Sequence, residues 1–517
     1  MARYKDYDYS QGKFIPIHFD RQILPGTFEY SLHYLLDEEI DLSLFDTRYQ
    51  NDEMGAPAYD PAILLKIILY AYSRGITSSR KIAQCCQENV IFMALSADTQ
   101  PHFTTISDFI STSGQEIIHL FLELLLICDE MGLIGKEMFA VDGCKLPSNA
   151  SKEWSGTKKE LEKKRGKMEK AIRQIVKRHR EVDVREGDRG VIEQEEQYVE
   201  TLRGKVKKIK AWLRENEDKP GKSGKPIKSN ITDNDSAKMK TSHGVIQGYD
   251  GVAVIDSKHQ VVVHAEAFGA AQEHDLLIPM IEGTRENFEA IGNKKDVFKQ
   301  GKLTADSGFH TEANMKEVME QGVDAYIADT QFRRRDPRFS DVDKYKERFR
   351  KERAEYYGVA DLYRPHRDFT ISEDKTHCIC PGSKRLYRNG GNVVVRGQRA
   401  IKFHGRKTDC RICQLRERCL RHPGITEARQ VYFFQGSAES KPETFTQKMK
   451  RKIDSIKGRL IYNRRLGTAE PVFGNICSTI GLNRFTLRGK QKVNTQWLLY
   501  CAVHNLFKVH RYGLEFE

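Results

Sequence analysis

The sequence predicts an α/β fold, with an all-α N-terminal domain ahead of a layered core. Two observations carry this prediction. Residues 1–130 hold apolar runs of helical length, whereas residues 135–330 place short apolar runs before, between and after helical segments. Strands that alternate with helices are typical of a layered α/β structure. A chain of 517 residues has room for about three domains.

The composition favours a nucleic-acid partner over a membrane. The formal net charge is +13, which attracts polyanions. The most apolar runs, 62–72 and 117–128, are too short to span a bilayer and are interrupted by Lys66 and Glu123, so we expect buried helices. Residues 1–13 have no apolar core, so no signal peptide is expected. The eleven cysteines then indicate a reducing, cytoplasmic compartment.

The N-terminal domain is predicted to contain two consecutive short helices. Asp60 and Pro61 are typical of a helix start, and Gly75 is typical of its end. Residues 77–95 follow as a second helix, with an apolar face that includes Ile82. The pair fits a DNA-binding helix-turn-helix and fits an ordinary helical bundle equally well.

The first part of the core is predicted between residues 135 and 330. Residues 137–146 form an apolar run that predicts a buried strand ending at Asp142. The remaining elements follow in order: two strands within 244–269, a helix at 274–288, a strand at 302–308, a helix at 311–322 and a strand at 324–329.

A charged stretch, residues 151–229, interrupts this core. Its apolar residues recur at steps of three and four along two arms, which residues 185–190 separate. This spacing predicts an antiparallel helical hairpin, followed by a flexible linker over residues 219–230. The excess of Lys and Arg is either a solvated face or a contact for DNA phosphates.

Three carboxylates are candidate metal ligands. Asp142 and Asp306 each end an apolar strand, and Glu470 is the one acidic residue among several Lys and Arg between residues 461 and 490. Pro471 disfavours helical angles at the residue before it, so we expect Glu470 at the start of a helix. Oxygen ligands that converge in this way suit two Mg²⁺ (or Mn²⁺) ions, which catalyse phosphodiester chemistry.

A second metal site is predicted in residues 331–452, which are basic and lose regular periodicity. Cys410 and Cys413 have the spacing of a zinc knuckle, and other cysteines lie nearby. The predicted ligands of a structural Zn²⁺ are Cys380, Cys410, Cys413 and Cys419. The alternative is a set of reduced thiols in a loop-rich insertion.

Four segments together resemble the DDE transposases of bacterial insertion sequences. They are DTQPHFTTISDF (98–109), VDGCKLPSNAS (141–151), TADSGFH (304–310) and YNRRLGTAEPVFGNI (462–476). The last resembles the branch with a Tyr-x2-Arg motif before the glutamate, through Tyr462, Arg465 and Glu470. Cys477 stands where this branch usually has Lys.

The resemblance implies an RNase-H-like catalytic core, completed by a glutamate helix and C-terminal helices in residues 453–517. It implies Asp142, Asp306 and Glu470 as the catalytic metal ligands. Basic and aromatic side chains of the same region are expected to contact DNA through its phosphates. They are Tyr462, Arg464, Arg465, Arg484, Arg488 and Lys490.

The implied function is transposition in a bacterial, nucleoid-associated setting. The protein is expected to bind terminal inverted repeats, cleave there with two metal ions, and join the 3′-hydroxyl ends to double-stranded target DNA. A homo-oligomer, a dimer on DNA, is expected. Two alternatives stay open: a metal-dependent endonuclease without strand transfer, and a non-catalytic zinc-containing DNA-binding protein.

Overall fold

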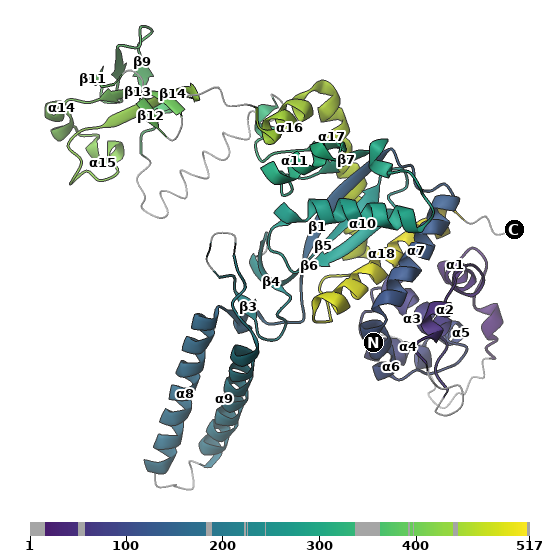
Figure 1. The fold of residues 1–517 in the computed structure, drawn as a ribbon. Helices are drawn as coiled ribbons and strands as arrows, with labels where there is room; N and C mark the ends of the chain where they lie inside the picture. Colours follow the sequence, from purple (N-terminus) through teal and green to yellow (C-terminus); the bar gives the residue numbers. More distant parts are fainter. Residues whose placement is uncertain are drawn as a thin grey trace, which may run out of the picture. The chain divides into compact units, whose positions relative to one another are not determined.

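A computed structural model of the chain describes residues 16–49, 57–181, 189–221, 224, 226–242, 244–336, 362–390, 393–395, 398–437 and 443–513. The chain forms two compact units (Figure 1). The first comprises Met1–Asp329 and Ser455–Glu517, and the second comprises Thr330–Asp454.

The N-terminal part of the first unit is helical, as predicted. Its main helices are α1 (Phe28–Tyr34), α2 (Ser43–Asp46), α3 (Pro61–Ser73), α4 (Ser79–Glu88), α5 (Val90–Leu95), α6 (Phe103–Thr112) and α7 (Gly114–Glu130). The predicted start of α3 is confirmed, because the Asp60 carboxylate accepts a hydrogen bond from the Ala62 amide at 2.7 Å. The single helix predicted over 77–95 is wrong. The chain breaks at Asn89, whose side chain caps α5 by accepting hydrogen bonds from the amides of Ile91 and Phe92.

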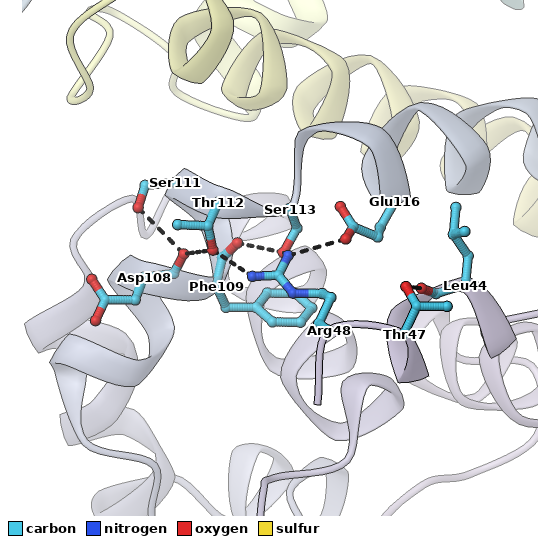
Figure 2. Close-up of polar contacts among 9 residues, drawn as sticks. All are labelled: Leu44, Thr47, Arg48, Asp108, Phe109, Ser111, Thr112, Ser113 and Glu116. Carbon is cyan, nitrogen blue, oxygen red and sulfur yellow. Dashed lines mark hydrogen bonds and ion pairs between the residues drawn. The ribbon is translucent and has the colours of Figure 1, made fainter. Parts of the chain in front are cut away.

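Arg48 ties the segment after α2 to the bend between α6 and α7 (Figure 2). Its guanidinium donates to the hydroxyls of Thr112 and Ser113 and lies 3.5 Å from Glu116 Oε1. The same group stands over the Phe109 ring, 5.8 Å from its centroid. One cation thus satisfies the polar groups at the junction of the two helices. Within the described residues, no single helix has the length and apolar composition of a membrane span, although the bent pair α6 and α7 together does.

The core of the first unit is a mixed sheet in the strand order β4-β5-β1-β7-β8, with β6 also paired to β5. The strands are β1 (Met138–Pro147), β4 (Ala237–Thr241), β5 (Gly244–Asp256), β6 (Val262–Phe268), β7 (Lys302–Ala305) and β8 (Asp324–Ile327). β5 runs antiparallel to β1, β4 and β6, whereas β1, β7 and β8 are parallel. The helices predicted between these strands are confirmed as α10 (Leu277–Ala290) and α11 (Glu312–Glu320). The sequence did not predict β4.

The C-terminal helices attach the N-terminal helices to the sheet. They are α17 (Ile456–Gly474), a π-helical turn (Asn475–Thr479) and α18 (Lys490–Tyr512). Trp497 Nε1 donates to Val252 O at 3.1 Å, and the Asn505 side chain exchanges two hydrogen bonds with the Val262 backbone at 2.8 Å. Tyr500 of the same helix stacks on Tyr72 of α3, with ring centroids 4.6 Å apart. α18 is therefore shared by both parts of this unit.

Two long helices, α8 (Lys158–Glu181) and α9 (Arg189–Glu215), lie side by side (Figure 1). Leu161 near the start of α8 packs with Ile209 and Trp212 near the end of α9, and His179 pairs with Glu195 at the opposite end at 2.6 Å. The two helices are therefore antiparallel. Residues 185–188 between them lie outside the described residues. The predicted flexible linker is wrong at its end, where β3 (Ser229–Asn230) is buried and pairs with β2 (Ser155–Gly156).

The second unit contains a sheet that the sequence did not predict. Its strands are β9 (Thr370–Ile371), β10 (His377–Ile379), β11 (Arg385–Arg388), β12 (Val393–Val395), β13 (Gln398–His404) and β14 (Gln430–Ser437). The order is β12-β13-β11-β10-β9, with β14 paired to β13. The unit also contains four short helices: α13 (Pro365–Asp368), α14 (Lys407–Arg411), α15 (Arg416–Cys419) and α16 (Phe445–Asp454). Leu386, Ile401, Phe403 and Val431 form part of its own apolar core. Residues 337–361 lie outside the described residues.

Candidate active site

Asp142 and Asp306 are neighbours on adjacent parallel strands. Val141 of β1 is opposite Ala305 of β7, and each aspartate is the next residue along its strand direction. The strand predicted over 302–308 is confirmed as β7 but is shorter: it ends at Ala305, and Asp306 directly follows it. The prediction that Asp142 ends a strand is wrong, because the residues after it stay paired with β5 as far as Pro147.

Burial and nearby carboxylates raise the pKa values of both aspartates. Burial raises the pKa of Asp142 above its usual value; the Arg465 charge opposes this shift and the Asp306 charge adds to it. Burial also raises the pKa of Asp306, followed by the charge of Glu273. Neighbouring carboxylates stay ionised more readily when a cation lies beside them, because the cation lowers their pKa.

Arg465 of α17 supplies one such cation. Its Nη1 lies 2.7 Å from Asp142 Oδ2, and the two side chains are 10% and 20% exposed. The guanidinium also stands 5.8 Å from the centre of the Tyr462 ring. The sequence predicted Arg465 and Tyr462 as DNA contacts and did not predict this ion pair.

Glu470 is placed differently from the prediction. It lies inside α17, near the C-terminal end, and not at a helix start, and its side chain is exposed. Pro471 has no N–H for the carbonyl of Gly467, four residues earlier, and the Gln260 side chain donates to that carbonyl instead at 2.8 Å. This replacement lets the helix continue through the proline. Five residues separate Glu470 from Arg465, a rotation of about 140° around the helix, so the two point to different sides.

Two acids that the sequence analysis missed lie beside the aspartate pair. Glu273, in a 3-10 turn before α10, has its Oε1 2.5 Å from Lys145 Nζ. Asp250 of β5 is fully buried opposite Lys145, with an oxygen 3.9 Å from the same Nζ. Burial, and then the charge of Glu273, raises the pKa of Asp250 to about 8. A carboxylate within the apolar β5 segment was the sequence signal that could have revealed Asp250.

Two glycines make room for these extra acids. A Cβ on Gly143 would stand 2.8 Å from Asp250 Oδ1. A Cβ on Gly308 would stand 2.1 Å from Glu273 Oε2 and 3.0 Å from Asp306 Oδ1. A side chain at either position would therefore have to displace these carboxyl oxygens, and the space beside Gly308 is bordered by oxygens of both Glu273 and Asp306.

The basic residues after α17 hold the chain against the end of β1. Arg484 Nη2 donates to Ser148 O at 3.0 Å, and Arg488 Nε donates to Asn149 O at 2.6 Å. Lys490 Nζ pairs with Glu266 Oε1 of β6 at 2.7 Å. Their contact with DNA stays a prediction, as does that of Arg464, whose side chain is exposed on α17.

Cys477 lies in the π-helical turn after α17 and is half-buried. A hydrogen bond from the Cys144 thiol lowers its pKa. Cys144 is two residues beyond Asp142 on β1, so the residue that replaces the expected lysine contacts the strand of the first aspartate.

The four cysteines predicted to bind zinc line one cavity of about 30 Å³ in the second unit. Cys380 follows β10, Cys410 lies in α14, Cys413 follows it, and Cys419 ends α15. All four thiols are free, and burial raises the pKa of Cys419 to about 11. Among the residues that the structure describes, no three Cys, His, Asp or Glu side chains are already spaced to hold a metal ion, here or beside Asp142. Zinc therefore stays a prediction, which the shared cavity supports.

Two family models match separate parts of the chain. One describes a transposase DDE domain and matches residues 379–510, which include Tyr462, Arg465 and Glu470 but neither aspartate. The other describes a transposase domain (DUF772) and matches residues 17–112, the N-terminal helices. No curated protein matches the chain. Both descriptions name transposase domains, and together the two matches support a DDE transposase of an insertion sequence.

Proposed function

We propose that the protein binds the terminal inverted repeats of its element, cleaves DNA there with two divalent metal ions, and joins the 3′-hydroxyl ends to target DNA. The observation that carries this proposal is the pair Asp142 and Asp306, side by side on β1 and β7 in a chain of this family. The strand order β6-β5-β1-β7-β8, antiparallel and then parallel, supports an RNase-H-like core.

The residues present fit Mg²⁺ or Mn²⁺. Carboxylate oxygens are the ligands these ions prefer, and the buried oxygens of Asp250 have no hydrogen-bond partner of their own. Asp142 and Asp306 would hold the ions, with Glu470 as third ligand on the strength of the Tyr-x2-Arg…Glu motif. Bound ions activate the attacking water or hydroxyl and stabilise the leaving oxygen. Arg465 must release Asp142 Oδ2 for an ion to take that oxygen.

The surrounding side chains would position the DNA. Arg464 is exposed beside Tyr462 and suits a backbone phosphate. Arg484 and Arg488 lie beside the end of β1, and Lys490 pairs with β6; we propose that their charges attract the DNA backbone through counterion release. We propose a homodimer on DNA, so that two element ends are cut and joined together, and a structural Zn²⁺ at the four cysteines of the second unit.

Cleavage of labelled DNA that carries the terminal repeat tests this proposal. We expect nicking at the repeat boundary with Mg²⁺ or Mn²⁺, its loss in Asp142→Asn and Asp306→Asn, and no change in Glu282→Gln, an exposed acid on α10. Products joined to target DNA distinguish a transposase from an endonuclease. Tight binding without cleavage by wild-type protein would contradict the proposal and favour a non-catalytic DNA-binding role.

A further inference from the structure

Glu273 stands between the cation Lys145 and the proposed metal ligand Asp306. One of its oxygens, Oε1, contacts Lys145 Nζ at 2.5 Å. The other, Oε2, lies over Gly308, where a side chain would overlap it. The Gly308 amide donates to Asp306 Oδ1 at 2.7 Å, so this glycine holds one carboxylate and leaves room for the other.

Carboxyl groups outnumber cations around Glu273. Four carboxylates, those of Asp142, Asp250, Glu273 and Asp306, lie beside two cations, Lys145 and Arg465. Asp250 is fully buried, and neither of its oxygens has a hydrogen-bond partner. The cation beside Asp250 is Lys145, whose Nζ lies 3.9 Å from one Asp250 oxygen, so this one ammonium group faces the carboxyl groups of both Asp250 and Glu273.

From this arrangement we propose that Glu273 is a further ligand of the divalent ion held at Asp306, through Oε2, and that Lys145 positions it by holding Oε1. The inference rests on the proposed function, since it adds a ligand to the same metal site. Gly308 contributes to the proposed site, because it has no side chain to fill the space between the carboxyl groups of Glu273 and Asp306.

The inference is tested by measuring Mn²⁺ binding to the full chain, without any cleavage. The readout is the loss of the electron paramagnetic resonance signal of free Mn²⁺. Glu273→Gln keeps the size of the side chain and an oxygen for Lys145, but it removes the charge. We expect this variant and Asp306→Asn each to weaken Mn²⁺ binding at least tenfold, the range seen when supporting groups of metal sites are removed. Glu282→Gln is the matched control, and its affinity should equal that of the wild type.

Wild-type affinity in Glu273→Gln, with a tenfold loss in Asp306→Asn, would overturn the inference and leave the proposed function standing. Equal affinity in the wild type and Asp306→Asn would overturn both. A second variant, Gly308→Ala, keeps the Glu273 charge but fills the space beside Oε2, and it should also weaken Mn²⁺ binding. If Glu273 serves only as the ion-pair partner of Lys145, Glu273→Gln and Gly308→Ala will lower the midpoint of urea unfolding and leave the Mn²⁺ affinity unchanged, which would also overturn the inference.

Discussion

Replacement of Arg465 by Gln is expected to destabilise the first unit strongly when no divalent ion is present. The Arg465–Asp142 pair is 2.7 Å long and mostly buried. Two unit charges about 4 Å apart attract by about 4 kcal/mol at an effective dielectric of about 20. Removing one partner of a buried pair costs about 3–5 kcal/mol, and the partial exposure of Asp142 points to the lower end. We therefore expect a loss of about 3 kcal/mol in EDTA.

The assay is urea unfolding followed by the fluorescence of Trp497, which is fully buried between α18 and β5. Trp154 and Trp212, which pack with α8 and α9, are replaced by Phe so that the signal comes from Trp497 alone. If a divalent ion binds Asp142 as proposed, it competes with Arg465 for that carboxylate, so the variant should gain more stability from Mn²⁺ than the wild type gains. Arg464→Gln, an exposed neighbour, should change stability by no more than about 0.5 kcal/mol. A loss below about 1 kcal/mol in Arg465→Gln, or equal gains from Mn²⁺, would refute this reasoning.

Three further predictions follow from particular contacts. Gly308→Ala should lower the free energy of unfolding by about 1–3 kcal/mol, because the new methyl group is overpacked. At Gly204 a Cβ meets nothing within 4 Å, so Gly204→Ala should stabilise α9 by about 0.5–1 kcal/mol. Urea unfolding measures both changes. Burial lowers the pKa of His504 to about 4, below its ordinary 6.5. The free energy of unfolding should therefore be constant above pH 6.5 and fall as the pH drops towards 4, because the unfolded chain then binds a proton that the folded one does not. The slope is at most about 1.4 kcal/mol per pH unit. His504→Gln should flatten that part of the profile, and an unchanged slope would contradict the assignment. Elemental analysis should find about one zinc per chain, reduced to a trace in Cys413→Ser, and a zinc-free wild type would rule out the site.

The order of the core elements could be predicted because it depends on local periodicity. The apolar run before Asp306 and the helical spacing of α10 and α11 belong to single elements, and the structure confirms them. The position of Asp142 within β1 could not be predicted in the same way. Its strand extends to Pro147 because β5, about a hundred residues later, pairs with that extension.

Other differences arise from side chains that are distant in sequence. Pro471 predicts a helix boundary by a local rule, and Gln260 overrides it by donating to the carbonyl that the proline leaves without a donor. Glu273 joins the site only through Lys145 and Gly308, so no pattern around it indicates its place. The short strands of the second unit, such as β9 with two residues, are too brief to show a period of two.

The most direct test of metal ligation at the centre of this account is a change of metal preference in Asp306→Cys. A thiolate binds Mg²⁺ poorly and accepts softer ions more readily. If Asp306 is a ligand, the variant should lose cleavage of the terminal repeat with Mg²⁺ and regain part of it with Mn²⁺, while the wild type cleaves with both. Wild-type cleavage by Asp306→Cys in Mg²⁺ would contradict the proposed metal site.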